Sequence, residues 1–298
     1  MSLYKYVSCE NAMWILNGNI RMTQPSEFND PFELAIELYV SPDTKDAIYN
    51  FQFDILSPRE SLGSNMLPDD FESDFCHDIG IRDIREELDK SIGILCLSKR
   101  NDSHLMWAHY ANNYSGVVLE FDKEHEFFEG LMDMEYREKR LKINFDYFIK
   151  REKEIPLSAL FVKPKIWEYE NEVRITRNLK GLKKAKNPKG KLPIYLDEIP
   201  IECIKSVTLG ERTKNNDALS IFNKIKNTNI ELKLAAIPPR GYDFRYELIK
   251  ANLPVSKLNP LVSPRTADIF KNEKFALGEV SRWMISNHPM RKIVSKTL

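Results

Sequence analysis

The sequence lacks the features that mark several common classes of protein. Its four cysteines are far apart and form no CxxC pair, so we expect neither a disulfide framework nor a structural zinc site. No apolar run approaches the roughly 20 residues that cross a membrane. Tyr4, Lys5 and Tyr6 interrupt the apolar stretch that a secretory signal would need. These absences predict a cytoplasmic protein without membrane contact.

Neither sign of charge is in excess. The chain has 44 Lys and Arg residues against 44 Asp and Glu residues, so no overall field draws it to nucleic acid. A lysine-rich stretch at residues 180–191 is interpreted as a solvated hairpin loop, with a phosphate contact as the alternative. There is no Walker loop, no GxGxxG after a strand and no GxSxG, which excludes the common nucleoside-triphosphatase, Rossmann and hydrolase motifs. Nucleic acid is therefore not an expected partner.

The sequence does contain the pattern of a globular protein with strands and helices. Of its 298 residues, 42% are hydrophobic and 30% are charged, a composition that supports a full core. Periodicity predicts strands over 3–7, 20–23, 93–98, 117–122, 204–209 and 231–237, and helices over 10–16, 104–113 and 217–226. A charged region that ends near residue 151 is also expected to be helical. The predicted fold class is therefore α/β, of the mixed α+β kind, with a central mixed sheet and flanking helices.

Two segments depart from this core pattern. Residues 41–91 are acidic and have a sequence pattern typical of helices. We interpret them as a helical insertion whose last helix is residues 81–88. Residues 251–298 contain several prolines and one amphipathic helix, 275–285, and predict a helical extension docked on the core. We expect a single α/β domain over residues 1–250 that carries the insertion and is followed by the extension.

Charged side chains recur at every second position in one predicted strand. Residues 167–175 read as extended, so that Glu170, Glu172 and Arg174 would share one face while Val173 points to the core. One interpretation is a cross-strand charge network that only stabilises the sheet. The other is a functional site, because buried charges need either one another or a ligand.

Other polar groups stand in apolar sequence at the ends of predicted elements. Ser98 ends one strand, and His109 and Tyr110 lie in the short helix 104–113. A lone histidine at such a place is often a core residue with its hydrogen bonds made inside the protein. Several polar groups together in apolar sequence favour a shared site instead. His104 and His109 are five residues apart, which does not place them on one helix face, so a zinc site is not expected.

Several short boxes resemble a known bacterial family. The segment 105–122, LMWAHYANNYSGVVLEFD, is similar to the Met-Trp-x-His-Tyr signature of domain of unknown function family 2971. The N-terminal LYKY, the FNDP box at 28–31 and the WEYENEVR box at 167–174 are similar to further motifs of that family. The resemblance covers roughly residues 3–240. It implies a bacterial protein but assigns no activity.

The order of the polar groups is also similar to the layout of ADP-ribosyltransferases. Those enzymes place an Arg or His on an N-terminal strand, a Ser on a later strand, and a Glu, often in an E-x-E pair, on the last. The resemblance implies that Glu172 is catalytic and that Glu170 faces the acceptor. The first strand has Lys5 or Tyr6 where those enzymes have Arg or His, so His109 or Arg21 would supply that contact.

In this first hypothesis the protein consumes NAD as a transferase or glycohydrolase, in a toxin or phage-defence setting. NAD is the co-substrate, and neither a tightly bound cofactor nor a metal ion is expected. The residues expected to contact NAD are Tyr6, Lys5, Ser98, Tyr110 and Arg174.

Two other hypotheses stay open. A non-enzymatic module would recognise a nucleotide, a nucleic-acid end or a protein in the same place, and its tail would contact a protein partner. It predicts that Glu172 is paired with Arg174 or backbone groups and closed to solvent. A metal-dependent nuclease would instead need Asp30, Asp122 and Glu170 to converge.

Overall fold

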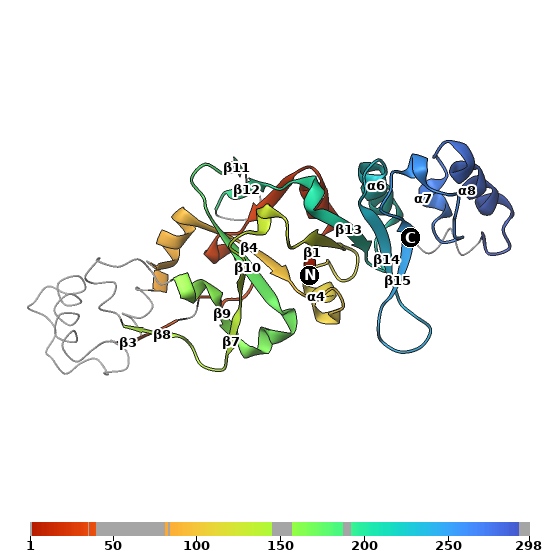
Figure 1. Ribbon diagram of the computed structural model, residues 1–298. Helices are drawn as coiled ribbons and strands as arrows, with labels where there is room; N and C mark the ends of the chain where they lie inside the picture. Colours follow the sequence, from red (N-terminus) through yellow and green to blue (C-terminus); the bar gives the residue numbers. More distant parts are fainter. Residues whose placement is uncertain are drawn as a thin grey trace, which may run out of the picture.

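An eight-stranded mixed sheet forms the centre of the molecule (Figure 1). The computed structural model describes residues 2–34, 36–39, 81–82, 84–144, 157–186 and 192–291. In spatial order the strands are β15 (Arg245–Lys250), β14 (Glu231–Ala236), β13 (Ile204–Leu209), β5 (Val117–Asp122), β1 (Ser2–Val7), β4 (Ile92–Ser98), β10 (Glu172–Asn178) and β6 (Met132–Asp133). The β13–β14 pair is parallel and its neighbours are antiparallel, so the predicted mixed sheet is confirmed.

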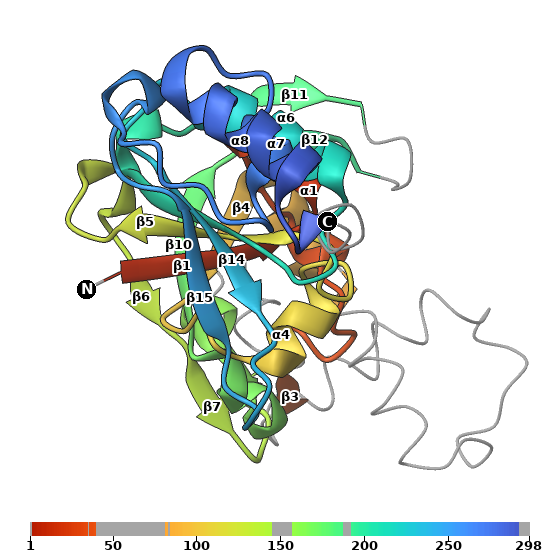
Figure 2. The ribbon, with the colours of Figure 1, turned by 90° about the vertical axis from the view of Figure 1, so that its right-hand side faces the viewer.

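Four helices cover one face of this sheet. They are α1 (Cys9–Leu16), α6 (Asn215–Ile225), α7 (Ala267–Phe270) and α8 (Phe275–Asn287). Figure 2 shows them on one side of the sheet and α4 (His104–His109) on the other. Buried apolar side chains of α6 recur at the spacing of one helix face, which confirms the predicted helix. Phe222 of α6 meets Phe270 of α7 edge to face, with ring centroids 5.0 Å apart.

Two hydrophobic clusters cover the opposite face. Around α4, the fully buried Trp107 packs with Tyr6 and Val118. Farther along the sheet, residues 84–91 and the short helix η3 (Leu157–Phe161) pack over Ile94 of β4. The polar ends of β4 and β10 come between these clusters.

Short strands surround the main sheet. The strands β11 (Lys183–Ala185), β12 (Ile194–Glu198) and β2 (Asn19–Met22) form one small sheet, β3 (Glu37–Tyr39) pairs with β8 (Lys142–Asn144), and β7 (Glu135–Arg137) pairs with β9 (Val162–Pro164). Single 3₁₀ turns also occur, namely η1 (Pro25–Glu27), η2 (Glu126–Phe128), η4 (Lys165–Glu170), η5 (Ile201–Cys203) and η6 (Val255–Lys257).

Several local predictions need correction. The charged region before residue 151 contains η2 and short strands up to residue 144 where a helix was expected, because pairing with β9, β10 and β3 overrides its helix propensity. Helix α4 ends at His109, since the chain turns through left-handed backbone at residues 112–114. Part of the lysine-rich stretch is strand β11.

Other predictions fall partly outside the described residues. The helix expected at the end of the insertion is present at 81–82 and 84–91, whereas residues 40–80 lie outside the described part of the chain. The same holds for residues 187–191 of the lysine-rich stretch. Among the described helices, none is both long and apolar enough to cross a bilayer.

Candidate functional site

The predicted polar constellation forms where β4 and β10 end side by side. Glu172 lies opposite Ser98, and Arg174 lies opposite Cys96, so their side chains share one face of the sheet. The expected continuous strand from Trp167 is wrong, because residues 165–170 form η4. Asn171, in left-handed backbone with φ of 44°, turns the chain into the strand, a conformation that Asn tolerates better than most residues.

Glu172 is held by two cations. Its Oε1 accepts from Arg174 Nε at 2.7 Å, and its Oε2 accepts from Lys163 Nζ at 2.9 Å. The side chain is only 5% exposed. Burial alone would raise the pKa of Glu172, but the charges of Arg174 and Lys163 lower it to about 2. Glu172 is therefore a buried, permanently charged group with both carboxylate oxygens engaged.

Glu170 shares Lys163 with Glu172. Lys163 Nζ donates to its Oε2 at 2.6 Å, and the Tyr110 hydroxyl donates to its Oε1 at 2.6 Å. Burial raises the pKa of Glu170 despite these donors. Ser98 does not reach the carboxylate; its Oγ donates to the Glu170 backbone carbonyl at 2.6 Å. Ser98 thus fixes the turn that presents Glu170.

A third carboxylate completes the cluster. Glu33 Oε1 lies 2.5 Å from Arg174 Nη2, and Glu33 Oε2 lies 4.0 Å from Lys163 Nζ. Glu33 Oε1 is buried and makes no well-aligned hydrogen bond, and burial raises the pKa of this carboxyl group. Arg174 also donates from Nη1 to the Leu160 carbonyl at 2.7 Å. We call this set, Glu33, Lys163, Glu170, Glu172 and Arg174, the charge cluster.

Sequence reasoning did not identify Glu33 or Lys163 as members of the site. Glu33 lies two residues after the FNDP box at 28–31, which was identified only as a motif similar to the family, and Lys163 lies in β9, ahead of the WEYENEVR box. The one available signal was charge placed in apolar sequence, such as Lys163 between Val162 and Pro164. Only the fold brings residue 33 to residues 163 and 174.

The remaining predicted site residues lie outside the charge cluster. The Tyr6 hydroxyl donates to the Arg100 carbonyl at 3.1 Å, and its ring packs on Trp107. Lys5 Nζ donates to the Cys96 carbonyl at 2.9 Å, and burial lowers the pKa of this amine. These two residues have structural partners inside the protein.

His109 is solvent-exposed rather than a core residue. Its ring centroid lies 6.3 Å from that of Tyr110 and 6.3 Å from that of Trp167. His109 therefore stands at the surface beside the cluster, separated from Glu172 by the side chains of Tyr110 and Glu170. Where the structure places them, His109, Tyr6 and Lys5 do not converge with Glu172.

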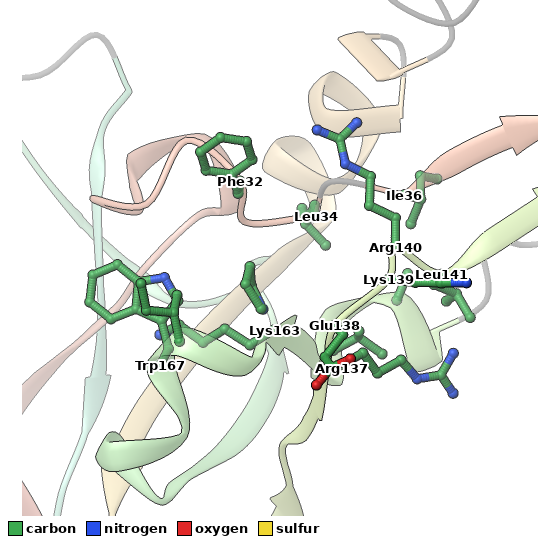
Figure 3. A pocket seen from close by; sticks show the side chains of 14 residues that line it. Phe32, Leu34, Ile36, Arg137, Glu138, Lys139, Arg140, Leu141, Lys163 and Trp167 are labelled. Atoms are coloured by element: carbon green, nitrogen blue, oxygen red, sulfur yellow. The ribbon is translucent and has the colours of Figure 1, made fainter.

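A pocket opens next to the charge cluster (Figure 3). Its volume is about 310 Å³, and its lining residues are Phe32, Leu34, Ile36, Arg137, Glu138, Lys139, Arg140, Leu141, Ala159, Val162, Lys163, Pro164, Ile166 and Trp167. Lys163 belongs to both the pocket and the cluster. Its ammonium lies 5.0 Å from the centre of the Trp167 ring, within cation–π range.

The pocket has an apolar wall and a basic rim. Figure 3 shows Phe32, Leu34 and Trp167 on one side and Arg140 arching toward Phe32 from the other. The Arg140 guanidinium lies 5.9 Å from the centre of the Phe32 ring. The charged ends of Arg137 and Lys139 point away from the cavity. Arg140 is thus the cation placed to meet a ligand at the mouth.

The carboxylates required by the nuclease hypothesis do not gather. Asp122 ends β5 and pairs with Lys205 at 2.9 Å. Asp30 accepts from the Phe32 backbone N–H at 2.9 Å. Within the described ranges there is no group of three His, Cys, Asp or Glu side chains that could hold a metal ion. Glu170 is instead neutralised by Lys163.

Comparisons with known proteins add no relative. No family model matches the chain, and no match was found among curated proteins or among solved structures.

Proposed function

We propose that this protein is a ligand-binding module whose pocket takes a small anionic molecule with a flat apolar part, of the size of a mononucleotide. One observation carries the proposal, namely the 310 Å³ cavity with an apolar wall and a basic rim. Ligand sites in proteins are usually concave and mostly apolar, with a few polar groups that orient the ligand. The aromatic rings of Phe32 and Trp167 offer the apolar contact, and Arg140 offers the charge.

The charge and the size of the pocket support this ligand class. Arg140 is the basic side chain that faces the pocket, because Arg137 and Lys139 point away from it and Lys163 is bound to Glu170 and Glu172. One lining residue, Glu138, is acidic. Glu138 is itself paired with Lys165 at 3.4 Å. Ligand pockets range over about 300–1,000 Å³, so this pocket is at the small end. A mononucleotide matches that volume better than a dinucleotide such as NAD.

The state of Glu172 also favours a binding module. The non-enzymatic hypothesis predicts Glu172 paired with Arg174 and closed to solvent, which is the arrangement in the structure. A transferase that uses Glu172 to contact the nicotinamide ribose would first have to break two charge-assisted hydrogen bonds to it. Such bonds are roughly twice as strong as neutral ones.

An NAD-consuming transferase or glycohydrolase is the second candidate, and Glu170 is the observation that favours it. Burial raises the pKa of Glu170, and a carboxyl group with a raised pKa is suited to act as a general acid or base. Glu170 contacts the pocket residue Lys163 and the half-buried Tyr110. In that case Glu170, rather than Glu172, would act on the acceptor.

A thermal-shift titration with AMP, ADP, GMP and NAD, with nicotinamide release followed in parallel, tests both candidates. Saturation at a hundred times the dissociation constant adds about 2.7 kcal/mol of stability, which raises the midpoint by about 4 °C in a chain of this length. We expect that shift with a mononucleotide and its loss in Arg140→Glu. Lys257→Glu, the same charge change in the exposed η6 turn, is the control.

Two outcomes would reject the binding proposal. Folded protein that shows no shift with any of the mononucleotides has no such site. Nicotinamide release from NAD that is lost in Glu170→Gln would establish the second candidate instead.

A further inference from the structure

The strand β15 is an open edge of the main sheet. Within the described part of the chain it pairs with β14 alone. Its outer row of backbone N–H and C=O groups is therefore available to another strand. Proteins usually protect such an edge with proline or with outward-pointing lysine. β15 has no proline, and its one lysine, Lys250, is fully buried with its ammonium bound to backbone carbonyls inside the fold.

Apolar side chains are exposed along one face of this edge. Tyr246 is 38% exposed and Leu248 is 59% exposed. Phe244, directly before the strand, continues the row, with its ring 6.4 Å from that of Tyr246. In the adjoining hairpin loop, Tyr242 is 90% exposed. Contiguous exposed apolar groups of this kind mark interaction surfaces.

The regular part of the edge has a defined centre. The register of β14 and β15 shifts after the Leu232–Lys250 pair, so Ile249 has no partner and the ladder is irregular beyond Leu248. The evenly paired part of the strand is therefore 245–248. Phe244 directly precedes it, and Tyr246 is the middle residue of the segment 244–248.

The segment 244–248 is complementary to itself if two copies of it pair as antiparallel strands with Tyr246 at the centre. Tyr246 then lies opposite Tyr246 of the second copy, and Phe244 lies opposite Leu248. On the other face, Arg245 and Glu247 already pair within one chain, and Arg265 reaches Glu247 at 3.6 Å. In the paired strands Arg245 of each copy also lies opposite Glu247 of the other, once on each side of the centre. Directly opposed residues of opposite charge stabilise a strand pair, and like charges destabilise it. Pairing centred on Glu247 would instead oppose two carboxylates.

The helices that follow β15 lie toward one end of the strand. Both ribbon views place α7 and α8 toward the Lys250 end of β15 and the hairpin loop at the Arg245 end. A two-fold axis at Tyr246, perpendicular to the sheet, therefore sets the helices of one copy near the loop of the other. Specific interfaces bury about 1,200–2,000 Å², and exposed Tyr242, with Leu253 and Leu261 after the strand, adds apolar area beyond the strands.

We propose that two copies of this chain pair through β15 and form one continuous sheet around a two-fold axis at Tyr246. The second copy is the partner that the charges favour, because antiparallel pairing sets the Arg245–Glu247 pair of each copy against the reversed pair of the other. The proposal does not depend on the pocket or its ligand.

Sedimentation equilibrium and light scattering over a wide range of concentration test it. We expect a species of twice the 34.8 kDa of one chain. Glu247→Arg should weaken the dimer by about tenfold or more, because Arg then faces Arg on both sides of the axis. A mixture of the single variants Arg245→Glu and Glu247→Arg should form a mixed dimer, because opposite charges then face each other across the axis but not within either chain. Glu129→Arg, an exposed position away from β15, is the control.

A wild-type chain that stays at the mass of one copy at every concentration would overturn the proposal. So would a dimer that neither Glu247→Arg nor Leu248→Lys weakens. Circular dichroism of each variant shows that it is folded, and the mixture of single variants separates pairing between copies from the Arg245–Glu247 pair within one chain.

Discussion

Glu172→Gln is the substitution that most sharply tests the role of the charge cluster. The change keeps the shape of the side chain but removes its charge and turns one oxygen into an N–H donor that faces a cation. A pKa of about 2, against the ordinary value of 4.5, means that the fold favours the charged form of Glu172 by about 3 kcal/mol. We therefore expect Glu172→Gln to lower the free energy of unfolding by about 3 kcal/mol at neutral pH.

Urea unfolding followed by tryptophan fluorescence measures this loss. The midpoint should fall while the dependence on urea concentration stays the same, since the surface exposed on unfolding does not change. Glu198→Gln, at an exposed position in β12, is the matched control and should stay within about 0.5 kcal/mol of the wild type. If Glu172→Gln is as stable as that control, Glu172 does not hold the cluster together.

The difference in stability between the wild type and Glu172→Gln should depend on pH. Because folding lowers the pKa of Glu172, its contribution to stability is complete above about pH 4.5 and is lost as the pH falls toward 2. Glu33 and Glu170 have raised pKa values, so their protonation favours the fold as the pH falls, in both proteins. The difference between the wild type and Glu172→Gln should therefore narrow below pH 4.5. A constant difference would contradict the assigned pKa.

Three further substitutions test buried contacts elsewhere in the fold, each by the same urea assay. Trp107→Ala removes a fully buried indole and should cost about 3–5 kcal/mol; a loss below 1 kcal/mol would mean that the indole is not buried. Gly210→Ala should be strongly destabilising, because the new Cβ would lie 2.1 Å from the Tyr114 carbonyl oxygen, and soluble, fully stable protein would contradict that contact. Lys250→Met should cost about 1–3 kcal/mol, since it removes the donor to three backbone carbonyls; unchanged stability would show that those carbonyls do not need it.

Local sequence patterns determined most of the secondary structure of the main sheet. The apolar runs of β4, β5, β13 and β14 and the helical spacing in α6 need no distant partner to be recognised, because strand and helix periods are properties of neighbouring residues. The same patterns failed in the charged region before residue 144, where short strands depend on partners elsewhere in the chain.

The candidate site, too, was predicted from the sequence only in part. The sequence alone showed that Glu170, Glu172 and Arg174 belong together, since alternation or a tight turn keeps residues so near in sequence close in space. It could not show that Lys163 pairs with the two carboxylates and Glu33 with Arg174. Nor could it show that His109 and Tyr6 lie apart from Glu172. Those relations are decided by how distant segments pack on the sheet, because a buried charge takes whichever opposite charge the fold brings within reach.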